Sequence, residues 1–271
     1  MREITHLNQL LPHEASNIAF VPTMGALHAG HAKLIERARQ CSSNVLVSVF
    51  INPLQFGDPK DLEKYPRNPA ADAAVARQSG AAILWRPEFK EIYPGYIESI
   101  SAGPLGELFE GVSRKGHFDG MLTVVNRLFN LIAPQWAIFG EKDFQQLFLV
   151  TRMVREQGKK IEIIEVPTVR DVDGLALSSR NVRLSDEDRV AARVISKALI
   201  NASKANSLRG MQEQLDNTLA QEPRFTRDYS AIIDEEDFAL AREESAAKRA
   251  LVAGWVSGVR LIDNMAMRSP S

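Results

Sequence analysis

Cysteine is nearly absent from this 271-residue sequence, in which Cys41 is the only one. A single cysteine excludes intrachain disulfides, iron–sulfur clusters and cysteine-rich zinc sites. An excess of one charge is lacking as well, since 33 Lys and Arg residues are balanced by 34 Asp and Glu residues. A chain with a formal net charge of −1 has no global field to attract nucleic acid or an anionic membrane.

Long apolar runs are also missing. The longest ones lie near Val45–Ile51 and fall far short of the roughly 18 residues that indicate a membrane span. The N-terminal residues lack the apolar run of a secretory leader. We therefore expect a cytoplasmic protein with neither a membrane nor a nucleic acid as its partner.

Two common nucleotide-binding fingerprints are absent. Gly25 and Gly30 have the glycine spacing of a Walker A loop, but His31 and Ala32 stand where that loop needs Lys and Ser or Thr. No GxGxxG pattern follows any predicted strand, which excludes a dinucleotide fingerprint.

Short apolar runs alternate with amphipathic segments through the first part of the chain. Strands that alternate with helices favour a parallel sheet with right-handed crossovers, so we predict a doubly wound α/β domain over residues 1–170. The expected strands are 18–24, 44–52, 81–85, 97–102, 136–139 and 161–166, and the expected helices are 31–40, 69–79, 120–133 and 143–157.

The remainder of the chain, residues 171–271, predicts a smaller α+β domain. It has helical patterns over 186–202 and 209–219 and short strands at 229–233 and within 250–262. In the first domain, residues 53–67 are expected to be a loop, and residues 111–120 a mobile loop because they contain three glycines. Arg114, Lys115 and His117 of that loop either reach phosphates or are solvated, and the second alternative is favoured.

The strongest local signal is the run from Pro22 to His31, where a buried strand passes into a helix. A helix N-terminus at the carboxyl end of a parallel strand suits a phosphate. His28 and His31 are three residues apart, so both face the same side of a first helical turn. The alternative is a pair of capping or surface histidines at an ordinary turn.

Three weaker signals accompany it. Lys142 follows a strand and could reach a phosphate, although such a charged loop is usually only solvated. Ser178, Ser179 and Arg180 suit a polyphosphate, or else form a capping linker. An amide such as Gln55 can bind a carboxylate or an amine, or be a turn residue.

Together these motifs resemble a known family. The His28-Ala29-Gly30-His31 run is similar to the HxGH signature of the nucleotidyltransferase superfamily, and Leu177–Arg180 stands where that superfamily has its KMSKS-like loop. More narrowly, the chain resembles the pantothenate synthetase (pantoate–β-alanine ligase) family. The resemblance rests on Val21–His31, Phe50–Phe56, Lys64–Arg67, Gly116–Val125, Gly140–Gln146, Gly174–Asn181 and Arg260–Asn264.

The resemblance implies a Rossmann-like domain, a smaller C-terminal lid, a homodimer, and a reaction that joins pantoate to β-alanine with ATP and Mg²⁺, releasing AMP and pyrophosphate. It implies that Gln55 contacts pantoate and β-alanine and that Gln146 contacts pantoate. The ATP-binding residues that it implies are Met24, Gly25, Ala26, Leu27, His28, Ala29, Gly30, His31, Gly140, Glu141, Lys142, Asp143, Val169, Leu177, Ser178, Ser179 and Arg180.

An acyl-adenylate mechanism needs donors for phosphoryl charge rather than an enzyme nucleophile. The donors expected to act in catalysis are His31, His28, Lys142, Ser178, Ser179 and Arg180. Relatives can carry an acidic cluster after the Tyr-Pro-Arg stretch, where this chain has only Asp72. Asp72 is therefore a weak candidate ligand of Mg²⁺, and phosphates and water could suffice.

Several alternatives stay open at this point. The first is a nucleotidyltransferase of the same superfamily that acts on another small acid or phosphate. A free-standing aminoacyl-tRNA synthetase core and a non-enzymatic nucleotide sensor are the others.

Overall fold

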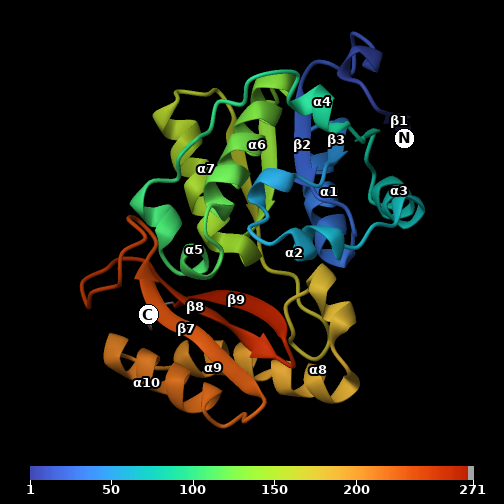
Figure 1. Ribbon diagram of the computed structural model, residues 1–271. Helices are drawn as coiled ribbons and strands as arrows, with labels where there is room; N and C mark the ends of the chain where they lie inside the picture. Colours follow the sequence, from blue (N-terminus) through green and yellow to red (C-terminus); the bar gives the residue numbers. More distant parts are fainter. Residues whose placement is uncertain (268–271) are drawn as a thin grey trace. The chain divides into compact units, whose positions relative to one another are not determined.

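The computed structural model describes residues 1–267, which form two compact units (Figure 1). The first unit comprises Met1–Glu141 and Gln145–Pro167. The second comprises Lys142–Phe144 and the chain from Thr168 onward. The last four residues of the predicted C-terminal domain lie outside the described range.

Six parallel strands make up the sheet of the first unit, in the order β1-β4-β3-β2-β5-β6. From β2 the chain adds strands first in one direction and then in the other, which is the doubly wound arrangement. The predicted fold class is thereby confirmed. The strands are β1 (Arg2–Ile4), β2 (Ile18–Thr23), β3 (Asn44–Val49), β4 (Ile83–Trp85), β5 (Trp136–Gly140) and β6 (Glu162–Val166).

Helices cover both faces of this sheet, as the alternation along β2 requires (Figure 1). Ala19 and Val21 belong to a buried cluster with Ile35 of α1, whereas Phe20 points the other way and packs edge-on against Phe129 of α6. The helices are α1 (Ala29–Cys41), α2 (Pro59–Glu63), α3 (Pro69–Gln78), α4 (Phe89–Ile92), α5 (Glu110–Ser113), α6 (His117–Ile132) and α7 (Phe144–Glu156).

The strands β2 and β5 separate before their carboxyl ends. Their pairing covers only Ala19 with Trp136 and Phe20 with Ala137. Pro22 follows two residues later and has no N–H to donate to a neighbouring strand. The pairing between β2 and β5 therefore ends at the point where the strand order reverses. Ligands bind at this point in such sheets.

The predicted strand over residues 97–102 is wrong, because the backbone of this segment bonds to helical side chains instead of a strand. The amide of Ile100 donates to Thr123 Oγ1 (2.9 Å), and the amide of Ala102 donates to Asp119 Oδ1 (2.7 Å). Arg152 Nη2 donates to the Ala102 carbonyl at 2.6 Å. The apolar alternation of the sequence thus marks an extended segment that is fixed to α6 and α7.

The mobile loop predicted over residues 111–120 is instead largely helical, since α5 and the first turn of α6 occupy most of it. The glycines serve close packing there. A Cβ atom on Gly111 would lie 1.9 Å from the Gly106 carbonyl oxygen, and one on Gly120 would lie 2.1 Å from the Leu54 carbonyl oxygen. The predicted loop over residues 53–67 likewise contains two short elements, a 3₁₀ turn at Pro53–Gln55 and α2.

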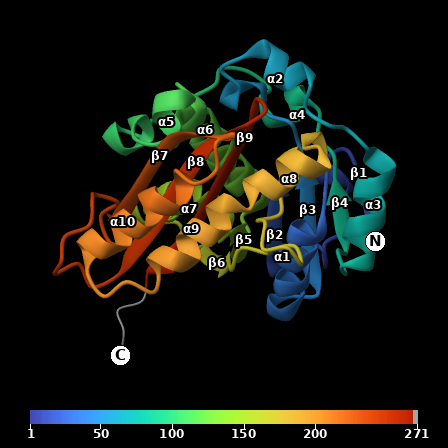
Figure 2. The same ribbon diagram turned by 90° about the horizontal axis from the view of Figure 1, so that it is seen from below.

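The second unit has helices on one face of a three-stranded antiparallel sheet, ordered β7-β8-β9 (Figure 2). The turn between β8 and β9 is Ser257–Gly258, whose positive φ values of 47° and 78° suit a tight hairpin. The predicted single helix over residues 186–202 is divided at Arg193. The elements are α8 (Asp186–Ala192), α9 (Val194–Ala202), α10 (Leu208–Leu219), β7 (Phe225–Asp234), β8 (Lys248–Val256) and β9 (Val259–Met267).

Within residues 1–267, no helix combines the length and the apolar character needed to cross a membrane.

Candidate active site

The turn between β2 and α1 has an unusual backbone conformation. Gly25 and Ala26 both have positive φ values, 87° and 52°, and the second is costly for a residue with a side chain. Asp72, a buried residue of α3, stabilises the turn because its Oδ1 accepts the amide of Leu27 at 2.8 Å. The amide of Gly25 donates to Thr23 Oγ1 at 3.3 Å. These contacts place the N-terminus of α1 at the end of β2, as the sequence predicts.

His28 and His31 form a reciprocal cap at the start of α1. His28 is the N-cap residue, and its Nδ1 accepts the amide of Gly30 at 3.1 Å. His31 Nδ1 accepts the amide of His28 at 3.3 Å, and the two rings are 4.2 Å apart. A ring nitrogen that accepts cannot carry the proton, so each neutral imidazole carries it on Nε2. The capping alternative and the ligand-binding prediction are compatible, because they use different ring nitrogens.

Gln55 ends a 3₁₀ turn after β3 and lies against the β2–α1 turn. Its Nε2 donates to Met24 Sδ at 3.0 Å, and Asn52 Nδ2 donates to its Oε1 at 3.3 Å. Asn52 Oδ1 in turn accepts the amide of Leu54 and the hydroxyl of Tyr93, both at 3.3 Å. Burial raises the pKa of the Tyr93 phenol, so this donor keeps its proton at neutral pH. Two predicted ligand residues, Met24 and Gln55, are thus brought together.

His117 and Gly120 support the Gln55 turn from α6. His117 is buried and not solvated, contrary to the alternative that the sequence favoured. Its Nδ1 donates to the Gln55 carbonyl at 2.9 Å, and its Nε2 accepts from Arg114 Nη1 at 3.0 Å. Gly120 has no side chain, which lets α6 approach the Leu54 carbonyl.

The neighbouring glutamines of α7 have different surroundings. Gln145 is buried, and its Nε2 donates to the carbonyls of Leu105 and Leu108 at 2.8 and 2.9 Å. Its Oε1 accepts the amide of Glu110 at 3.2 Å, so the side chain fixes the segment from Leu105 to the start of α5. Gln146, predicted as a pantoate ligand, is only partly buried.

The end of β5 contributes residues to both units. Gly140 and Glu141 belong to the first unit, whereas Lys142 and Asp143 belong to the second. A 3₁₀ turn over Glu141–Asp143 connects β5 to α7. The predicted ATP-binding run of four residues is therefore divided between the two units.

Another predicted ATP-binding group comes together in the second unit. The amide of Leu177 donates to the Val169 carbonyl at 2.9 Å, and Arg170 pairs with Ala176 as an antiparallel bridge. Ser178 caps the next 3₁₀ turn, Ser179–Arg183, with its Oγ accepting the amide of Arg180 at 3.3 Å. The capping role foreseen as an alternative is thus present.

Mg²⁺ has no cage of protein ligands in the part of the chain that the structure describes. Residues 1–267 contain no group of three His, Cys, Asp or Glu side chains that could hold a metal. Asp72 is the predicted candidate, but its Oδ1 already accepts the Leu27 amide. This carboxylate therefore fits a structural role better than a place in a metal site.

A comparison with protein families now identifies the chain. A family model described as pantoate–β-alanine ligase matches residues 1–266. The chain belongs to the pantoate–β-alanine ligase family. Members of this family form a carbon–nitrogen bond, so the chain is a ligase of that type.

Individual relatives in the family match almost end to end. The pantothenate synthetase of Thermus thermophilus is 46% identical over 97% of this chain and 96% of its own length. A crystal structure of a Thermus thermophilus pantothenate synthetase gives a TM-score of 0.93 at 44% identity and covers 98% of this chain and 99% of that one. A Francisella tularensis pantoate–β-alanine ligase, crystallised with "Beta-gamma ATP" and β-alanine, gives 0.80 at 34% identity, with coverages of 98% and 97%.

Sequence reasoning missed several residues that support the site. His117 was misjudged because a glycine-rich surrounding suggested a loop. No role was foreseen for four polar side chains that bond to the Lys142 carbonyl or to one another, because they come from distant positions. They are Arg170, Arg249, Asp263 and Asn264.

Proposed function

We propose that this ligase makes pantothenate from pantoate and β-alanine in two steps with ATP as the activating substrate. In the first step, a pantoate carboxylate oxygen bonds to the α-phosphorus and the bond to pyrophosphate breaks. In the second, the β-alanine nitrogen bonds to the acyl carbon, AMP leaves with the former carboxylate oxygen, and the amine loses a proton. The supporting observation is the β2–α1 turn, which His28 and His31 cap and which Gln55 contacts through Met24, at the strand end where such sheets bind ligands.

The first step requires no general base, since a carboxylate is ionised at neutral pH. It requires donors for the charge that grows on the phosphoryl oxygens. The Nε2–H groups of His28 and His31 and the positive end of α1 supply some of them. Lys142, Ser178, Ser179 and Arg180 complete the set that we propose to act in catalysis. The other predicted ATP ligands are Met24, Gly25, Ala26, Leu27, Ala29, Gly30, Gly140, Glu141, Asp143, Val169 and Leu177.

Gln55 is proposed to orient both pantoate and β-alanine. A carboxamide can donate to a carboxylate and accept from an ammonium group, which are the two groups that must meet. Its carbonyl and side chain are fixed by His117 and Asn52, so little rotational freedom is lost on binding. Gln146 is proposed as a second contact for pantoate.

We also propose that Mg²⁺ enters with the phosphates of ATP and keeps mostly water and phosphate ligands, as this ion prefers. Residues 1–170 are proposed as the nucleotide- and substrate-binding domain and residues 171–271 as a lid domain. A cytoplasmic homodimer completes the proposal, and light scattering of the purified protein measures its mass.

The deciding experiment is pantoate-dependent exchange of labelled pyrophosphate into ATP, with Mg²⁺ and without β-alanine. Exchange that requires pantoate is the expected result, because adenylation is reversible and needs no amine. Exchange with a different acid would favour another nucleotidyltransferase of the superfamily. ATP binding without exchange under any acid would contradict the adenylation step and favour a nucleotide sensor.

A further inference from the structure

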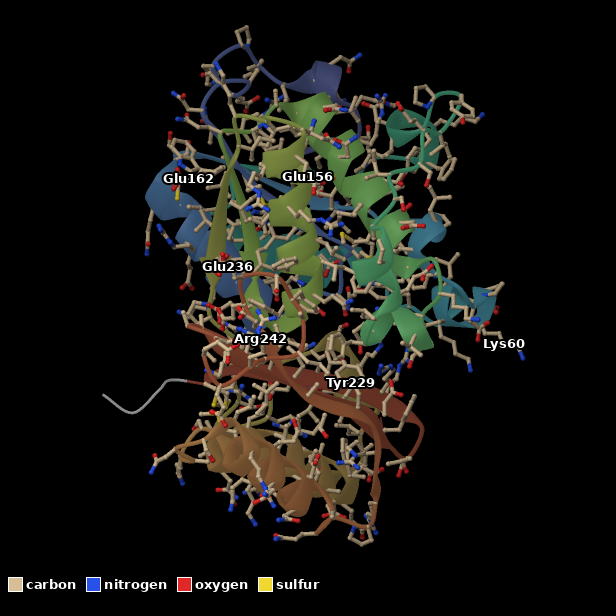
Figure 3. The ribbon with its side chains drawn as sticks, turned by 90° about the vertical axis from the view of Figure 1, so that its left-hand side faces the viewer. Lys60, Glu156, Glu162, Tyr229, Glu236 and Arg242 are labelled. Atoms are coloured by element: carbon tan, nitrogen blue, oxygen red, sulfur yellow. The ribbon has the colours of Figure 1, made fainter. Side chains whose placement is uncertain are left out.

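The three-residue segment Lys142–Phe144 is held by the second unit, although it follows directly on β5 of the first. Its contacts come from β8, β9 and the segment between β7 and β8. Glu236 and Arg242 of that last segment are labelled in Figure 3. A lysine proposed to reach a phosphate therefore takes its backbone position from residues about a hundred places further along the chain.

Asn264 of β9 makes the central contact. Its Nδ2 donates to the Lys142 carbonyl at 2.9 Å, and its Oδ1 accepts from Arg249 Nη1 at 2.7 Å. A guanidinium has donors only, so the amide oxygen must face Arg249 and the amide nitrogen must face the carbonyl. Both partners thus determine the same orientation of the carboxamide.

The position of Asn264 is itself fixed by an ion pair. Arg170 donates to both oxygens of Asp263, at 2.5 and 3.0 Å, and also to the Asn264 carbonyl at 3.3 Å. Asp263 Oδ1 accepts the amide of Asn264 at 2.8 Å. Burial raises the pKa of the Asp263 carboxyl, and the Arg170 guanidinium opposes that shift. Asp263 and Asn264 are 5% and 4% exposed, so their mutual bonds are not weakened by competing water.

The other end of the segment is held through the ring of Phe144. The guanidinium carbon of Arg249 lies 4.0 Å from the centre of this ring. Phe238 stacks on it with 6.0 Å between ring centres and 16° between their planes. Arg249 therefore holds the segment twice, through Asn264 at one end and over Phe144 at the other.

We infer that Asn264 is a positioning residue for Lys142. Asn264 fixes the carbonyl of Lys142, and so fixes the direction in which the lysine side chain leaves the backbone. The inference rests on the proposed phosphate-binding role of Lys142. A lysine whose backbone is fixed can stabilise the negative charge that develops at one position in the transition state. A lysine on a mobile turn stabilises that charge much less. Asp263 and Arg170 act by fixing Asn264, whereas Arg249 acts both through Asn264 and directly on the Phe144 ring.

The sharpest variant is Asn264→Asp. It keeps the size of the side chain and an oxygen for Arg249, but it replaces the donor to Lys142 with an oxygen that repels the carbonyl. The matched control is Asn201→Asp in the same unit, because Asn201 Nδ2 donates to Thr218 Oγ1 at 3.2 Å, far along the chain from the segment. Pantoate-dependent pyrophosphate exchange is expected to fall about 10- to 100-fold in kcat for N264D, with the pantoate KM nearly unchanged. N201D is expected to match the unchanged chain.

A double-mutant cycle with Lys142→Ala separates positioning from general damage. In the Lys142→Ala background, N264D is expected to lower exchange less than about threefold, because the side chain that it misplaces is already gone. Equal losses in both backgrounds would overturn the inference, and so would unchanged exchange in N264D alone. If N264D does not fold, Asn264→Ser replaces it in the same cycle.

Amide hydrogen exchange of a peptide spanning residues 140–147 gives a readout that does not depend on catalysis. N264D is expected to speed this exchange and N201D to leave it unchanged. If the unchanged chain shows no pantoate-dependent pyrophosphate exchange, the proposed function fails. Faster hydrogen exchange in N264D would then still show that Asn264 stabilises the Lys142–Phe144 segment. If hydrogen exchange is the same in all three proteins, the inference fails whatever the enzyme does.

Discussion

The β2–α1 turn and the Lys142–Phe144 segment both lie between a strand and a helix, but they are held in different ways. The first is held mainly from within, since His28 and His31 cap each other's backbone three residues apart. The second is held by Phe238, Arg249 and Asn264, which lie about a hundred residues further along the chain. Local support can be recognised from a short motif, whereas distant support needs the fold.

The largest effect is expected from His31→Ala, which tests the internally held turn. It removes a proposed donor to ATP and the acceptor for the His28 amide. Pyrophosphate exchange should fall by roughly 10²–10³, the effect of losing one well-placed donor. Chemical denaturation should show a loss of only about 1 kcal/mol, the usual effect of a lost helix cap. Normal exchange would remove His31 from the mechanism.

The next largest effect is expected from Gly120→Ala. It tests the Gln55 turn, which is held both by a nearby residue, Asn52, and by the distant helix α6. The added Cβ would lie 2.1 Å from the Leu54 carbonyl oxygen and 2.7 Å from the Gln55 nitrogen. Overpacking against backbone atoms at these distances should cost about 3 kcal/mol of stability or more. We expect the pantoate KM to rise more than the ATP KM, and Gln55→Ala to shift the same constant. Similar rises in both KM values would show that the turn serves ATP as well.

A smaller effect is expected from Asp72→Ala, which removes the main contact that the β2–α1 turn receives from outside its motif. The Leu27 amide would lose its acceptor in a buried setting, at a cost of about 1–3 kcal/mol. Asp72→Asn keeps an acceptor oxygen and should cost less. If Asp72 instead served as a ligand of Mg²⁺, Asp72→Asn would raise the Mg²⁺ concentration required for exchange. Titration of Mg²⁺ in the exchange assay distinguishes the two roles.

The smallest effect is expected from Phe144→Leu, which weakens the distant support without touching Asn264. It keeps an apolar side chain but loses the Phe238 stack and the Arg249 contact, together worth about 1 kcal/mol. Thermal unfolding should report this loss, with exchange reduced less than in N264D. A larger loss of exchange than in N264D would place the control of Lys142 in the ring rather than in the amide.

The sequence predicts the parallel sheet well because buried β-branched runs and amphipathic helices carry strong periodic signals. It also locates the capped turn, since His28, Gly30 and His31 lie within one helical turn. It misjudges residues 97–102 because an apolar alternation cannot distinguish a strand from a segment bonded to Thr123 and Asp119.

The remaining misses share one physical cause. When only their neighbours in sequence are considered, Gly111 and Gly120 indicate flexibility. In the fold, a backbone carbonyl from another turn packs so closely against each of them that no side chain would fit. Asn264 lies in a segment that carries the family resemblance, but nothing local shows that its amide faces Lys142. Contacts between distant positions leave no pattern in a single sequence.

Because Lys142–Phe144 belongs to the second unit, the chain cannot be cut once to give two complete units. A protein ended at Pro167 would lack Phe238, Arg249 and Asn264, and would expose the ring of Phe144 and the Lys142 carbonyl to water. Neither unit is thus a self-contained building block that recombination could transfer alone. A gene fragment that encodes only residues 1–167 should give a less soluble product than its composition suggests.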